Sequence, residues 1–115
     1  MKYTEKFQKL ANIAQTQVEK VEANTVNKLI ASGAIALDIR DPDEHANGHI
    51  TGSLNISRGK LEMLIESKLP DLNTEILCYC NANNRGALSA ATLRYMGYVN
   101  AKYIAGGLNE YKKVA

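Results

Sequence analysis

The first twenty residues place apolar side chains at the spacing of one helix face. These positions recur every three or four residues between Lys, Glu and Gln side chains: Phe7, Leu10, Ala11, Ala14 and Val18. The period predicts an amphipathic helix over about residues 3–18, which packs on the rest of the chain or on a partner. We expect residues 1–20 to be a helical extension and residues 21–115 to form one domain.

After residue 20, short apolar runs alternate with segments of helical spacing. The runs that predict strands lie at residues 21–22, 34–39, 53–56, 74–80 and 101–104. The runs at 34–39 and 74–80 are nearly continuous, which is typical of strands buried on both faces. Alternating strands and helices predict an α/β domain, with helices on both faces of a mostly parallel sheet. Sites in such folds form beyond the carboxyl ends of the strands.

Capping residues set the expected starts of three helices. Asn24 or Thr25 is the expected cap of the helix that follows the first short strand, and Ser57 is the expected cap of a later one. Asp41 precedes a proline and two acidic residues, which is the composition of a first helical turn.

Composition narrows the classes of function. The chain has 115 residues, a net charge of +2 and ordinary apolar and charged fractions, as expected for one globular domain. Its Lys and Arg residues are scattered, which gives no reason to expect a nucleic-acid partner. No apolar run approaches the ~20 residues of a membrane span, and the first twenty residues are charged throughout. We therefore expect no membrane partner and a cytoplasmic location.

The two cysteines lie two residues apart on a predicted strand. Cys78 and Cys80 would leave the same face about 6–7 Å apart, which is too far for an easy disulfide. We interpret Cys78 as a core residue. Cys80, by contrast, ends the strand just before an Asn-rich loop and a helical pattern.

That strand–loop–helix arrangement makes Cys80 the candidate nucleophile. Backbone N–H groups in such a loop turn inward, and the next helix adds the positive end of its dipole, so the field favours an anion such as a thiolate. Arg85, five residues after the cysteine, adds positive charge. The thiolate is the reactive form of cysteine. A core cysteine is the alternative interpretation of Cys80.

Four motifs follow one another along the chain. Residues 38–45 read Asp-Ile-Arg-Asp-Pro-Asp-Glu-His, residues 48–56 read Gly-His-Ile-Thr-Gly-Ser-Leu-Asn-Ile, residues 80–86 hold the Cys–Arg loop, and residues 106–111 read Gly-Gly-Leu-Asn-Glu-Tyr. They resemble the rhodanese family, whose signatures are Asp-x-Arg-x-x-x-Glu-aromatic, Gly-His-Ile-x-Gly-(Ala/Ser)-x-Asn and Gly-Gly-x-x-x-Trp. The chain departs from the last signature by having Tyr in place of Trp. The resemblance leaves the N-terminal helix outside.

The resemblance implies a three-layer rhodanese-like domain and a single-domain sulfurtransferase of the thiosulfate type. A persulfide on Cys80 would carry a sulfane sulfur from an anionic, thiosulfate-like donor to a thiol or cyanide acceptor, without metal or organic cofactor. The expected substrate-binding residues are those of the loop and one nearby arginine: Asn81, Ala82, Asn83, Asn84, Arg85, Gly86 and Arg58. The physiological donor and acceptor stay open, with a protein donor or acceptor among the alternatives.

The length and composition of the loop refine this expectation. Cys80 to Arg85 is six residues, as in rhodanese-like sulfurtransferases, whereas similar phosphatases and arsenate reductases use one more. Asn83 stands where the family usually has Gly, a change that Asn tolerates because it reaches left-handed backbone angles. Asn81 and Ala82 stand where thiosulfate-using members often carry Arg or Lys. We therefore expect weak thiosulfate affinity, unless Arg58 compensates.

The motif at residues 38–45 and the turn after it supply supporting residues. Asp38, Arg40 and Glu44 are expected to be structural, with an Arg40–Glu44 ion pair that ties the strand to the short helix. His49 is expected to order the turn at residues 48–52 by hydrogen bonding rather than to act as a base.

Two other hypotheses remain beside the enzyme. His45, His49, Cys78 and Cys80 are potential metal ligands, but their spacing is not that of an ordinary zinc site, so we expect no metal. The altered loop also suits a non-catalytic rhodanese-like module that recruits a protein or senses oxidants through Cys80. Absence of turnover with any sulfur donor would favour that module.

Overall fold

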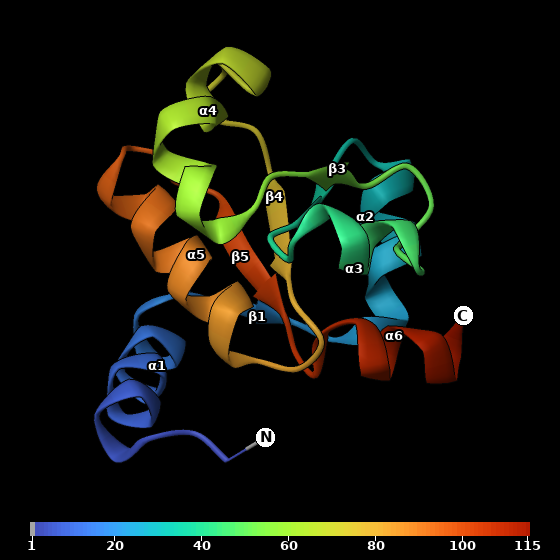
Figure 1. Cartoon of the computed structure of the whole chain (residues 1–115). Helices are drawn as coiled ribbons and strands as arrows, with labels where there is room; N and C mark the ends of the chain where they lie inside the picture. The colour runs from blue at the N-terminus through green and yellow to red at the C-terminus, as the bar shows by residue number, and fades with distance from the viewer. Residues whose placement is uncertain (1) are drawn as a thin grey trace.

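A parallel sheet with strand order β1-β5-β4-β2-β3 lies at the centre of the computed structural model, which describes residues 2–115 (Figure 1). The strands are β1 (Lys20–Val21), β2 (Ile35–Asp38), β3 (Leu54–Asn55), β4 (Ile76–Tyr79) and β5 (Ala101–Ile104). The helices are α1 (Glu5–Gln17), α2 (Val26–Ala31), α3 (Pro42–Ala46), α4 (Leu61–Lys68), α5 (Asn84–Tyr95) and α6 (Gly107–Val114). Two 3₁₀ helices, η1 (Ala23–Thr25) and η2 (Arg58–Lys60), precede α2 and α4.

The central strand β4 shows how the sheet is covered on both faces. Ile76 and Cys78, with Cys80 just after the strand, pack into the core with α1, α4 and α5, whereas Leu77 and Tyr79 pack into a second core with η1, α2 and α6. Figure 1 shows these two groups of helices on opposite sides of the sheet. Because side chains alternate along a strand, a strand that is apolar at every position must be covered on both faces. The predicted three-layer α/β fold is confirmed.

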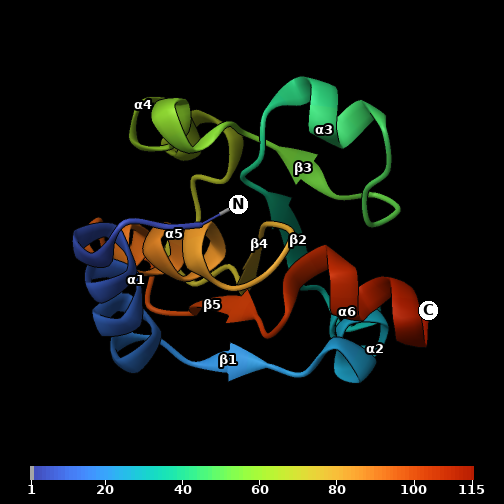
Figure 2. The same ribbon diagram turned by 60° about the horizontal axis from the view of Figure 1, so that its bottom comes forward.

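Helix α1 packs along α5 at one end of the molecule (Figure 2). Ala11 and Ala14 are buried, and small side chains let two helices approach closely. Leu10, which the sequence pattern places on the packing face, is instead 57% exposed. That part of the prediction is wrong because the buried face is the narrower stripe of small residues.

Two of the three predicted caps are wrong in detail. Thr25 and Ser57 make no capping hydrogen bond with their side chains, because 3₁₀ turns precede α2 and α4. The Thr25 hydroxyl donates instead to the carbonyl oxygen of Glu22 at 2.7 Å. The start of α3 is as predicted: the Asp41 N–H donates to the Glu44 carboxylate at 3.2 Å, as in a capping box.

Within residues 2–115, no helix is both long enough and apolar enough to cross a membrane.

Candidate active site

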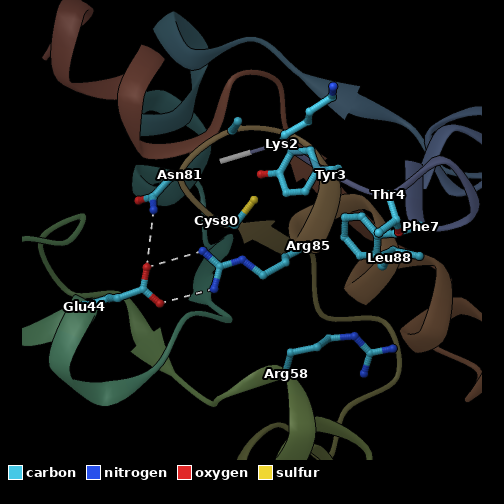
Figure 3. A pocket seen from close by; sticks show the side chains of 11 residues that line it. Lys2, Tyr3, Thr4, Phe7, Glu44, Arg58, Cys80, Asn81, Arg85 and Leu88 are labelled. Atoms are coloured by element: carbon cyan, nitrogen blue, oxygen red, sulfur yellow. Dashed lines mark hydrogen bonds and ion pairs between the residues drawn. The ribbon is translucent and has the colours of Figure 1, made fainter. Parts of the chain in front are cut away.

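Cys80 follows the last residue of β4 and lines a cavity of about 900 Å³ (Figure 3). The residue is only 3% exposed, so its sulfur is reached from the cavity. The Gly86 N–H, in the first turn of α5, donates to Sγ with an N–S distance of 3.4 Å. The first N–H groups of a helix have no acceptor within the helix, and here one of them faces the sulfur. Negative charge on this sulfur is therefore stabilised by the protein backbone.

Glycine at position 107 lets the first turn of α6 pack against the backbone of the Cys80 loop. The N–H groups of Leu108 and Asn109 donate to the carbonyl oxygens of Cys80 and Asn81 at 2.8 and 3.1 Å. Gly107 has a φ of +56°, and a Cβ there would overlap the carbonyl oxygens of Cys80 and Ala82. Only glycine fits this close approach of two backbones.

Three asparagines tie the loop to three different parts of the fold. The Asn81 amide bridges the Arg40 guanidinium and the Glu44 carboxylate, at 3.0 and 3.3 Å. Asn83 Oδ1 accepts from the Gly106 N–H at 2.7 Å. Asn84 exchanges two hydrogen bonds with Gln8 of α1 and accepts a third from Gln15. The side-chain amides of these three asparagines therefore hold the loop in place.

The charged residues of the site form a connected network, but not the predicted one. Arg40 donates to both oxygens of Asp38, at 2.9 and 2.8 Å. Glu44 instead accepts two hydrogen bonds from Arg85, at 3.2 and 3.3 Å (Figure 3). The expected Arg40–Glu44 ion pair is therefore wrong. Asp38 is fully buried on the strand next to Cys80 and is the nearer partner for Arg40, which leaves Glu44 to Arg85.

Two carboxylates are held ionised by these contacts. Burial alone would raise the pKa of Asp38, but hydrogen bonds from Arg40 and His45 outweigh burial and hold it below its ordinary value. The hydrogen bond from Arg85 lowers the pKa of Glu44 against a smaller opposing effect of burial. In the protein core, burial raises the pKa of the Cys78 thiol, so Cys78 stays a neutral packing residue, as expected.

Arg58 lies at the cavity, whereas His49 lies outside it. Arg58 lines the cavity, but its guanidinium is held by Glu62 and Thr92, at 3.1 and 3.0 Å. His49 is exposed, stacks on His45 at 3.7 Å between ring centroids, and its Nδ1 lies 2.7 Å from the His45 carbonyl oxygen. Among residues 2–115, no three His, Cys, Asp or Glu side chains are grouped to hold a metal ion.

The sequence prediction missed one side of the cavity. Lys2, Tyr3, Thr4 and Phe7 line it together with Cys80, Asn81, Ala82, Arg85 and Leu88. Figure 3 shows these N-terminal side chains across the cavity from Glu44 and Arg58. Phe7 carried a signal, since it lies on the apolar face of the helix, but that signal indicated packing. Lys2 and Tyr3 lie before the helix and had no periodic signal.

A family model for the rhodanese-like domain matches residues 22–114. This chain belongs to the rhodanese-like domain family. It is 30% identical over 97 residues to the thiosulfate sulfurtransferase GlpE of Pseudomonas entomophila, which covers 84% of this chain and 87% of that protein. The prediction of a rhodanese-type, thiosulfate sulfurtransferase-like enzyme is confirmed.

Two solved structures show different extents of similarity. The human single-domain sulfurtransferase TSTD1 aligns with a TM-score of 0.75 and 27% identity, over 85% of this rhodanese-like chain and 98% of its own. A Rhodopseudomonas palustris protein of unknown function, described as a possible tyrosine phosphatase, aligns with a TM-score of 0.84 and 27% identity. That alignment covers 98% of this chain and 93% of the other, so it extends into the region of α1.

Proposed function

We propose that this protein transfers a sulfane sulfur from an anionic, thiosulfate-like donor to a thiophilic acceptor through a persulfide on Cys80. The observation that carries the proposal is the contact between Sγ and the Gly86 N–H at the start of α5. This hydrogen bond stabilises the Cys80 thiolate, which attacks the donor in the first half-reaction and is regenerated in the second. The resemblance to thiosulfate sulfurtransferases supports the same class of donor.

The first half-reaction loads the sulfur. The Cys80 thiolate attacks the outer sulfur of the donor, a new S–S bond forms, and the donor's own S–S bond breaks. Sulfite leaves with the electron pair of that bond. Arg85, and the N–H groups of residues 81–86, would bind the anion and the loaded sulfur, with Arg58 at the side of the cavity.

The second half-reaction unloads it. An acceptor nucleophile, a thiol or cyanide, attacks the outer sulfur of the persulfide and returns Cys80 to the thiolate. Neither step needs a metal or an organic cofactor. The two displacements predict ping-pong kinetics. The cytoplasmic location inferred from the sequence stays a prediction.

Intact-protein mass spectrometry after incubation with thiosulfate tests this proposal. The wild type should gain one sulfur atom that cyanide removes, and Cys80→Ser should gain none and lose turnover by about 10³-fold or more. Cys78→Ala is the matched control, because Cys78 is fully buried in the core, and it should still be loaded. An adduct that survives in Cys80→Ser would implicate Cys78 and contradict the assignment of Cys80.

The same purified protein also tests two alternative functions, a phosphatase and a non-catalytic or redox-sensing module. The structural similarity to a possible tyrosine phosphatase motivates an assay with p-nitrophenyl phosphate, in which the six-residue spacing predicts no turnover. If no sulfur donor loads Cys80 and no phosphate ester is hydrolysed, a non-catalytic or redox-sensing module becomes the better hypothesis. A redox-sensing role would then require an oxidant to reach the nearly buried Cys80 sulfur through the cavity.

A further inference from the structure

The N-terminal segment closes one side of the Cys80 cavity. Lys2, Tyr3 and Phe7, which we call the outer wall, line the cavity although they precede the family match at residues 22–114. Tyr3 and Phe7 pair with ring centroids 5.3 Å apart, and Leu88 of α5 lies beside Phe7 in Figure 3. The outer wall therefore adds an aromatic surface that the family scaffold alone does not provide.

The cavity is larger than the proposed donor requires. Its volume of about 900 Å³ is in the upper range for sites that hold organic ligands, which run from about 300 to 1,000 Å³. A small inorganic anion such as thiosulfate fills only the region next to Cys80. The aromatic surface of the outer wall stabilises apolar carbon atoms, which thiosulfate lacks. The remaining space suits an organic molecule.

The charges on the lining indicate the sign of that molecule. The lining holds three cations, Lys2, Arg58 and Arg85, and one carboxylate, Glu44. Arg58 and Arg85 are paired with Glu62 and Glu44, whereas Lys2 has no ion-pair partner within residues 2–115. An anionic group on the ligand would therefore find its counter-ion at Lys2.

We propose that the outer wall is a subsite for the organic body of a small anionic thiol, which takes the sulfur from Cys80. This inference rests on the proposed function. The acceptor loses its thiol proton to water, and its thiolate attacks the outer sulfur of the Cys80 persulfide. A new S–S bond forms while the persulfide S–S bond breaks and leaves its electron pair on Cys80. The product is the persulfide of the acceptor, and no external oxidant or reductant is consumed.

Acceptor selectivity tests the subsite by kinetics. Turnover is measured with thiosulfate as donor and either reduced glutathione or cyanide as acceptor, because cyanide is too small to reach the outer wall. Phe7→Ala and Tyr3→Ala should raise the KM for glutathione about 5–20-fold. They should change kcat/KM for cyanide by less than about twofold. Leu10→Ala is the matched control, since Leu10 lies on the same helix as Phe7 and is exposed outside this cavity.

Charge reversal tests the position of the anion. Lys2→Glu should raise the KM for glutathione, and the effect should shrink at high salt. Lys9→Glu changes the net charge equally on exposed surface outside the cavity and should have little effect. The small-thiol subsite would be overturned if Lys2→Glu and Lys9→Glu changed the KM for glutathione equally. It would also be overturned if the outer-wall variants lost equal activity with cyanide and with glutathione, or affected only the reaction with reduced thioredoxin as acceptor.

Binding without chemistry separates this inference from the proposed function. S-methylglutathione has no free thiol, so its binding to the wild type, measured by calorimetry, does not require sulfur transfer. Binding that Phe7→Ala weakens about 5–20-fold and Leu10→Ala leaves intact would support the subsite even if no donor loads Cys80. Absence of binding to the wild type would overturn it even if transfer to cyanide is fast.

Discussion

The two walls of the Cys80 cavity are built in different ways. The inner wall, residues 80–86, is fixed by hydrogen bonds from Arg40, Gly106, α1 and the first turn of α6. The outer wall is a short segment and the first turns of one helix, and Lys2 and Tyr3 are exposed to solvent. The inner wall lies within the family match, whereas the outer wall lies outside it.

This difference suggests a division of roles. Stabilising charge on a reacting sulfur requires donors that are held rigidly in position, and the inner wall provides such donors. Choosing among acceptors needs only contacts with the parts of the molecule that do not react. A change in the inner wall should therefore impair sulfur loading with every substrate pair, whereas a change in the outer wall should alter the KM for particular acceptors.

The largest expected effect is that of Gly107→Ala, which breaks the inner wall. The added methyl group would overlap the backbone of Cys80 and Ala82, at a φ that disfavours any side chain. We expect a loss of roughly 2–4 kcal/mol in the free energy of unfolding, measured with urea, and more than about tenfold slower sulfur loading by thiosulfate.

Gly59→Ala is the control for that substitution. Gly59 has an ordinary φ and nothing within 4 Å of an added Cβ, so the free energy of unfolding should change by less than about 0.5 kcal/mol. Normal loading by Gly107→Ala would show that the loop does not depend on the turn beneath it.

The inner wall was predictable to the extent that it is local. A strand, a loop and a helix within residues 74–96 place Cys80 at a strand end and its sulfur near backbone N–H groups. The partners of Arg40 and Arg85 were not predictable in this way. The sequence does not say which acid each arginine pairs with, because that depends on how strand, loop and α3 meet in three dimensions.

The asparagines and the outer wall show the same limit. Nothing local distinguishes Asn84, bonded to a helix about seventy residues earlier in the chain, from a solvated loop residue. Phe7 looked like a packing residue because periodicity reports which face is apolar, not what lies opposite it. The sequence pattern therefore could not predict contacts between segments that are distant in the chain.

Asn84→Ala should have an intermediate effect, because Asn84 joins the two walls. Its amide is nearly buried and bonds to Gln8 and Gln15, so its removal leaves their amides without these partners. We expect a loss of about 1–2 kcal/mol in the free energy of unfolding. The KM for glutathione should rise less than in Phe7→Ala.

A double-mutant cycle with Gln8→Ala measures this link directly. Direct hydrogen bonds predict a coupling energy of about 0.5 kcal/mol or more between positions 8 and 84. Asn24→Ala, at an exposed site, controls for the loss of an amide and should change stability by less than about 0.5 kcal/mol. Strict additivity of Gln8→Ala and Asn84→Ala would show that the inner wall is not tied to α1.

The smallest expected effect is that of Glu44→Gln, which changes charge and little else. Gln can keep the capping contact with the Asp41 N–H, so α3 should persist. Loss of the carboxylate leaves the charge of Arg85 uncompensated in the cavity. The KM for thiosulfate should fall about 3–10-fold at low salt and less at high salt. Glu110→Gln, on the exposed surface of α6, is the control for net charge.

The pH dependence of stability tests the same ion pair. Hydrogen bonding from Arg85 lowers the pKa of Glu44 in the folded protein, so the pair adds stability above the ordinary pKa of glutamate, about 4.3. That contribution is lost as the pH falls through the lowered pKa. The free energies of unfolding of wild type and Glu44→Gln should therefore differ most at neutral pH and converge in acid. A difference that stays constant from pH 7 to pH 3 would show that Arg85 is not paired with an ionised Glu44, and the inner wall would then carry more positive charge than its geometry indicates.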